Sequence, residues 1–137
     1  MSSLEEIEAR RAARKEVLAK QREEQRAVDL EAIDALEVQF GDSNIRYVDV
    51  PFMPGLPTLA AVRCPKPIEI KRYRATVAPD HKAFAAKAAE DLGAICLVYP
   101  VGDLRDQLLE ARPGLLVGLG MESLGMSTGK AQDEGKG

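Results

Sequence analysis

The segment from Ala78 to Pro100, APDHKAFAAKAAEDLGAICLVYP, constrains the fold most, because it joins a helical pattern directly to an apolar run. Asp80 is suited to cap a helix that begins at His81. Apolar side chains then recur at the three- and four-residue spacing of one helix face. They are Phe84, Ala85, Ala88, Ala89 and Leu92. Gly93 follows, where a helix commonly ends in a left-handed residue, so we predict a buried helix ending there and a core segment after it.

The first part of the chain predicts one long charged helix. Ser3 and Glu6 form the S-x-x-E pattern of a capping box, and neither Gly nor Pro interrupts the chain from Leu4 to about Asp34. The apolar residues approach heptad spacing only if Arg11, Arg14 and two glutamines occupy the seam. Two interpretations stay open: a solvated arm that orders against a partner or packs loosely on its own domain, or a helix that self-associates.

Alternating apolar and polar residues predict a small antiparallel sheet after this helix. Residues 36–40 are predicted as a strand or a helix-to-strand crossover, followed by a turn at 41–44 and a strand at 45–50, which together would form a hairpin. Two further strands are predicted at 58–64 and 68–77. The prolines between 51 and 57 place Phe52 and Met53 on a loop, because proline cannot donate to a sheet ladder.

The C-terminal part predicts two short helices and a tail. Asp103 is suited to cap a helix that runs to about Ala111, with Leu104 and Leu108 facing inward. A second helix, 114–124, would pack its leucines on the central helix. Residues 126–137 show no apolar period, and we predict a disordered tail there.

The predicted fold class is therefore α+β: a small antiparallel sheet followed by a helical subdomain, with a long charged N-terminal helix and a disordered C-terminal tail. The corresponding boundaries are a helical arm at 1–35, a globular domain at 36–125 and the tail at 126–137. The N-terminus carries charges from Glu5 onward and no apolar leader, and no window is long and apolar enough for a membrane span, so a cytoplasmic protein is expected.

Residues that could support catalysis are scarce. The only histidine is His81, and a thiol nucleophile would need it beside Cys64 or Cys96. A helix N-terminus disfavours an imidazolium, and an apolar run raises the pKa of a thiol. One histidine and two distant cysteines supply no recognisable metal site. We expect a protein that is not an enzyme, with no catalytic residues, cofactor or metal, and with both cysteines reduced and buried.

One stretch, residues 63–74, is basic within a chain of net charge −3. In the predicted strand, Lys71 and Tyr73 would lie on one face and Arg72 and Arg74 on the other, where they could contact an anion. The candidate anion-contacting residues are Arg63, Lys66, Lys71, Arg72 and Arg74. The sequence pI of about 5.3 argues against nucleic acid as a partner, and a solvated edge strand explains the same charges.

The layout from about residue 45 to 128 resembles the tail assembly chaperones of tailed bacteriophages. The segments that carry the resemblance are AAVRCPKPIEIKRYRATV, AAKAAEDLGAICLVYP and DLRDQLLEARPGL, followed by a leucine-rich helix and a polar tail. The resemblance implies a protein that binds the long, helical tape measure protein in the host cytoplasm and keeps it soluble until the tail tube polymerises.

Such a chaperone would expose apolar side chains to a helical client, and flexible methionines suit that role. The candidate partner-binding residues are Phe52, Met53, Met121 and Met126. Two alternatives remain. The chain is either an oligomeric virion or cellular structural protein that assembles through its N-terminal helix, or a small nucleic-acid-associated protein that uses residues 63–74.

Overall fold

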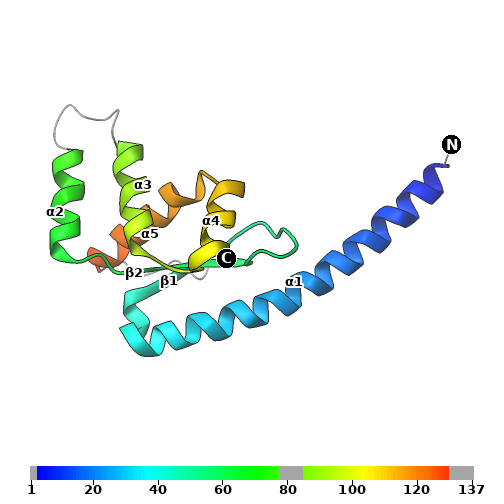
Figure 1. The fold of residues 1–137 in the computed structure, drawn as a ribbon, viewed down its shortest axis with the longest axis horizontal. Coiled ribbons are helices and arrows are strands. Elements are labelled where there is room, and N and C mark those ends of the chain that lie inside the picture. The colour runs from blue at the N-terminus through cyan, green and yellow to red at the C-terminus, as the bar shows by residue number, and fades with distance from the viewer. Residues whose placement is uncertain (1–2, 78–84, 130–137) are drawn as a thin grey trace.

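A computed structural model describes residues 3–77 and 85–129. It confirms the predicted class, with one long helix, a three-stranded antiparallel sheet and a group of shorter helices (Figure 1). The elements in chain order are α1 (Leu4–Phe40), the 3-10 turn η1 (Asp42–Asn44), β1 (Ile45–Asp49), β2 (Leu59–Arg63), α2 (Pro67–Thr76), α3 (Ala85–Cys96), β3 (Leu97–Tyr99), α4 (Gly102–Ala111) and α5 (Leu115–Ser127).

The sheet forms the middle layer of the body. Its order is β1-β2-β3, and both pairings are antiparallel, with Ile45 opposite Arg63 and Asp49 opposite Leu59 in the first. Side chains of β2 alternate between two apolar clusters, because successive residues of a strand point to opposite faces. Ala60 and Val62 belong to the cluster under the short helices, whereas Leu59 and Ala61 belong to the cluster under α1. The sheet is therefore covered on both faces.

The predicted long N-terminal helix is present and extends further than expected. The Ser3 hydroxyl accepts from the Glu6 N–H at 3.2 Å, and the helix runs without a break to Phe40. The predicted strand at 36–40 and its hairpin are wrong, because β1 pairs with β2 instead. Ile33, Leu36 and Phe40 all contact the sheet cluster, so the helical period overrides the local alternation of apolar residues.

The predicted strand at 68–77 is also wrong, since this segment is α2. Pro67 occupies the first turn, where a missing N–H costs nothing. The Glu69 carboxylate accepts from the Lys66 N–H at 2.7 Å, which satisfies a donor that the start of a helix leaves free. Pro67 therefore belongs to the entry into a helix and does not precede a strand.

The central helix α3 does not end at Gly93 but continues to Cys96. A side chain at Gly93 would place its Cβ 2.2 Å from the Leu116 carbonyl oxygen, and one at Gly120 would lie 1.9 Å from that of Ala89. Both glycines thus allow α3 and α5 to cross closely, and neither ends a helix. The Arg105 guanidinium donates to the Ala94 carbonyl at 2.7 Å and closes the end of α3 instead. The proposed cap at Asp80 and His81 lies outside the described residues.

The last two helices agree with the prediction except in detail. Leu108 and Leu119 are buried, but Leu104 is exposed and does not face inward. α5 continues through Ser127, so the first two residues of the predicted tail are helical, and residues 130–137 lie outside the described part of the chain. Both cysteines are free, with Cys96 buried and Cys64 only partly buried. Burial raises the pKa of the Cys96 thiol.

Candidate protein-binding groove

The buried Asp29 carboxylate fixes α1 to the sheet. Its Oδ2 accepts from the Thr58 N–H at 2.7 Å and from the Thr58 hydroxyl at 2.6 Å. Its Oδ1 accepts from Gln25 Nε2 at 2.9 Å and from the Tyr99 hydroxyl. One carboxylate therefore joins α1 to the start of β2 and the end of β3. Because every oxygen is satisfied, this buried group sets the direction in which α1 leaves the body.

The ion pairs that join α1 to the body begin at Arg22. Arg26 and Arg22 reach Asp49 at 2.5 and 3.9 Å, both as exposed pairs of the kind that contribute about 0–1 kcal/mol. Every residue from Glu8 to Gln21 is exposed. We call residues 4–21 the projecting arm and residues 22–40 the docked half. At 1.5 Å per residue the arm is about 27 Å long. Figure 1 shows that it projects away from the body.

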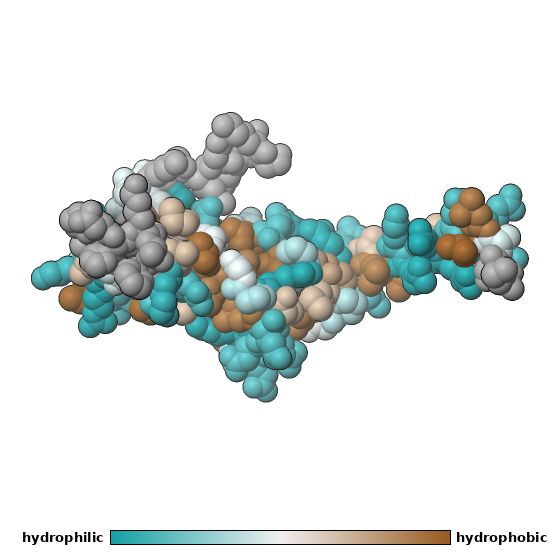
Figure 2. All heavy atoms as spheres, turned by 90° about the horizontal axis from the view of Figure 1, so that it is seen from above, coloured by the Kyte–Doolittle hydropathy of each residue, from teal (hydrophilic) through white to brown (hydrophobic). Residues whose placement is uncertain are grey.

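One face of the arm carries a strip that leads to the body. Arg10, Arg14, Val17, Gln21 and Val28 are spaced by three, four or seven residues, which places them on one side of a helix. Val17 is 56% exposed and Val28 is 59% exposed. Apolar side chains accordingly stand out among hydrophilic ones along the arm in Figure 2. This strip would cover an apolar ridge of a second helix.

The loop between β1 and β2 lies at the end of the strip that is nearest the body. Phe52, Pro54 and Gly55 face Gln21 and Val28 across a hollow of about 280 Å3. We call the strip and this hollow the arm–loop groove. Val17 and the stem of Arg14 extend its apolar surface toward the N-terminus, together with Ala13 and Leu18.

The loop is ordered by a tight turn. The Leu56 N–H donates to the Met53 carbonyl at 3.0 Å, and Gly55 has a positive φ of 85°. A proline followed by a glycine at the centre of a turn is what a type II turn requires, because only the second position needs φ above zero. The turn holds Phe52 against α1 and leaves Met53 exposed.

The structure separates the four predicted partner-binding residues. Phe52 lines the groove and Met53 lies on the same loop, whereas Met121 is exposed on α5 and lines no part of the groove. Met126 is only 8% exposed and belongs to the core, so its prediction as a contact residue is wrong. Val17 and Val28 were missed, although their spacing with Arg10 and Arg14 was a usable signal.

Charge along the groove is uneven. Arg10 and Arg14 lie one turn apart at its outer end, and Glu24 lines the hollow. Like charges at this spacing repel one another unless an opposite charge approaches. A partner helix with carboxylates opposite the outer end would supply that charge.

The basic stretch 63–74 does not form one anion site. Arg63 donates through both terminal nitrogens to the Glu69 carboxylate, at 2.8 and 2.9 Å. This bidentate pair lowers the pKa of Glu69 to about 2 and commits Arg63 to an internal partner. Lys66, Lys71, Arg72 and Arg74 are exposed around α2, not along the two faces of a strand.

Comparison with known protein families, with curated proteins and with solved structures finds no match for this chain. None of the helices in residues 3–77 and 85–129 combines the length and apolar character needed to cross a membrane. Over the same residues, no three His, Cys, Asp or Glu side chains gather as a potential metal site.

Proposed function

We propose that this protein is a non-enzymatic assembly chaperone that holds an amphipathic helix of a client protein in the arm–loop groove. The observation that carries the proposal is the pairing of exposed Val17 and Val28 with an ordered aromatic loop at one end of the same strip. A helix docks into such a surface through apolar residues repeated every three or four positions. The projecting arm gives the client access from solvent.

The resemblance to phage tail assembly chaperones suggests the client. A tape measure protein is long and helical, and it offers many amphipathic segments. A groove that carries exposed valines and is basic at its outer end suits a helix that has an apolar ridge and a carboxylate at one end. We propose that the tape measure protein is held in this way before the tail tube forms around it.

A labelled amphipathic peptide tests the groove directly. The probe is a helical peptide of about five turns, with a leucine ridge flanked by glutamates. Fluorescence anisotropy should show saturable binding, and Val28→Asp should weaken it about tenfold or more, because a charge would face the leucine ridge. Val38→Asp is the matched control: Val38 is exposed on the same helix but lines no part of the groove.

Two outcomes would count against the proposal. A scrambled peptide of the same composition could bind equally well, which would show that the contact lacks helix-face specificity. The two aspartate variants could also weaken binding equally, which would place the contact outside the groove.

A second candidate function is an oligomeric structural protein that assembles through α1. The observation in its favour is that the arm projects free of its own body. Pairing along the heptad seam is disfavoured, because Arg11 and Arg14 would meet their counterparts there. Light scattering on dilute protein with and without residues 1–21 separates the two functions, since only the structural protein forms through the arm an oligomer that persists on dilution.

A further inference from the structure

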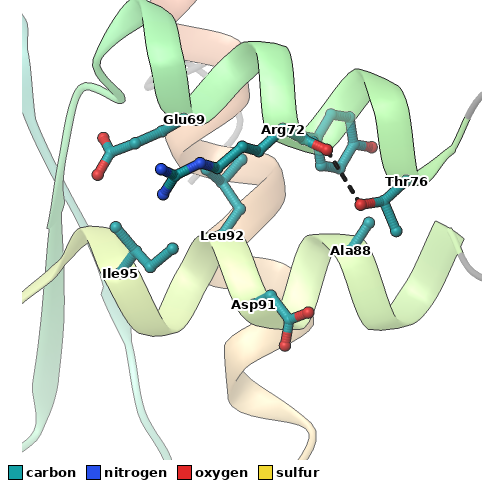
Figure 3. Close-up of a pocket in the computed structure, with 8 residues that line it drawn as sticks. Glu69, Arg72, Thr76, Ala88, Asp91, Leu92 and Ile95 are labelled. Atoms are coloured by element: carbon teal, nitrogen blue, oxygen red, sulfur yellow. Dashed lines mark hydrogen bonds between the residues drawn. The ribbon is translucent and has the colours of Figure 1, made fainter.

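A second apolar hollow lies at the end of the molecule away from the arm. α2 and α3 enclose a cleft of about 190 Å3, shown in Figure 3. Leu92, Ile95 and Ala88 of α3 form its floor together with Tyr73 of α2. Ile95 is 47% exposed, although it is a large aliphatic residue. An apolar cavity of roughly 150 Å3 can hold a benzene molecule, so this cleft has room for an aliphatic side chain.

The rim of the cleft carries a positive charge. Glu69, which lines the cleft, is neutralised by Arg63, and Asp91 on α3 pairs with Lys87 at 3.3 Å. Arg72 takes part in none of the ion pairs found among residues 3–77 and 85–129, and its guanidinium extends over the cleft in Figure 3. Lys71 and Arg74 add further charge on the exposed side of α2. The cleft therefore favours an apolar side chain flanked by carboxylates.

The tip of the projecting arm has this chemistry. Its sequence is Leu4-Glu5-Glu6-Ile7-Glu8, which places three carboxylates among two aliphatic residues. Leu4 and Ile7 are one turn apart on the same helix face, and Leu4 is 70% exposed. The tip thus offers an aliphatic pair with carboxylates on either side.

A chain cannot dock its own tip in its own cleft. α1 is a single unbroken helix, and Figure 1 shows its N-terminus at one end of the molecule and the two cleft helices at the other. We propose that the tip of one copy binds the α2/α3 cleft of a second copy, with Leu4 and Ile7 on the apolar floor and the tip carboxylates facing Arg72 and its neighbours.

This contact is head-to-tail, because two different surfaces meet. Such contacts give rings when the rotation between copies closes, and open series when it does not. A short tip in a small cleft makes a limited interface, so association should rise with concentration instead of being permanent. The inference does not depend on the arm–loop groove, since the tip and the cleft lie outside it.

A charge exchange tests the pairing in the full chain. The first variant, Arg72→Glu, changes the rim, so both its tip and its rim are acidic. The second variant combines Glu5→Lys and Glu6→Lys and changes the tip, so both its tip and its rim are basic. Sedimentation equilibrium should show that the wild-type mass rises above the 14.9 kDa of one chain with concentration. Each variant alone should stay at that mass. An equal mixture should regain the wild-type concentration dependence, because each tip then meets a rim of opposite charge.

Lys20→Glu serves as the control, because Lys20 is exposed on the arm but belongs to neither the tip nor the cleft; it should leave association unchanged. All changed side chains are exposed, so each variant should retain its helices, which circular dichroism checks. A wild-type mass that stays at one chain at every concentration would overturn the inference. So would single variants that associate like the wild type, or a mixture that stays at the mass of one chain.

Discussion

The two halves of α1 belong to one unbroken helix but differ in what surrounds them. The docked half, residues 22–40, buries Asp29 and Ile33 and is joined to two strands through one carboxylate. The projecting arm, residues 4–21, has no buried residue and carries a basic cluster beside isolated apolar side chains. Since packing of an apolar face supplies most helix stability in proteins, the docked half holds the arm in shape.

The difference shows which part of the helix the fold needs. A body that requires only the docked half has no structural use for about five more helical turns. The exposed Leu4, Val17 and Leu18 on those turns bury no apolar surface within the chain, and Val17 and Leu4 are residues that the client groove and the tip contact would use. We therefore place function on the arm and on the exposed face that ends at Val28, and stability on the buried residues of the docked half.

The largest expected effect comes from the core of the docked half. Ile33→Ala should lower the free energy of unfolding by about 2–5 kcal/mol, because Ile33 is fully buried between α1 and the sheet. Leu18→Ala on the projecting arm should change it by less than about 0.5 kcal/mol. Urea denaturation followed by circular dichroism measures both. Equal losses would remove the distinction between the two halves.

A smaller effect is expected from the hydrogen bonds of the buried Asp29 carboxylate. Asp29→Asn keeps the shape but replaces a charged acceptor by a neutral one and turns one oxygen into a donor. Thr58 can still donate to the remaining oxygen, so the loss should be about 1–2 kcal/mol in the same measurement. Glu16→Gln, an equivalent change on the arm, should have no measurable effect. An unchanged free energy of unfolding for Asp29→Asn would mean that the hydrogen bonds of Asp29 do not fix α1.

The smallest effect concerns Tyr99 and depends on pH. Burial, together with the bond to Asp29, raises the pKa of Tyr99 above its value in the unfolded chain. The contribution to stability is therefore complete below about pH 10 and falls as the pH rises beyond the unfolded pKa. Tyr99→Phe should cost about 1 kcal/mol at neutral pH and should reduce the loss of stability in alkali. A wild type and variant with parallel profiles up to pH 11 would contradict this account.

Much of the fold could be predicted where one pattern dominates. The capping box at Ser3 and the run without Gly or Pro predicted α1, and the leucine spacing predicted α5. The errors arose where a short segment fits two periods. Residues 36–40 alternate like a strand. They are helical because Leu36 and Phe40 pack on the sheet, which is a tertiary contact that the local sequence does not show. Gly93 looks like a helix end from the sequence alone. Its actual role, a close approach to Leu116, cannot be seen locally, because Leu116 lies more than twenty residues away in the chain.

The candidate site was only partly predictable. Prolines placed Phe52 on a loop correctly, since their missing donors exclude a central strand. Nothing local shows that this loop faces α1, because the contact depends on the direction that Asp29 gives the helix. Met126 was selected for its flexibility, but the continuation of α5 to Ser127 carries it into the core.

Amide hydrogen exchange along α1, resolved by residue, tests the central claim most directly. In dilute protein, the amides from Glu8 to Gln21 should exchange with little protection, because that stretch opens without breaking any buried contact, while those around Asp29 and Ile33 should approach the stability of the whole domain. Adding the amphipathic peptide should slow exchange in the arm and as far as Val28, which lines the groove, and should leave the amides around Ile33 unchanged. Uniform protection along the whole of α1 in the free protein would contradict the division on which this account rests.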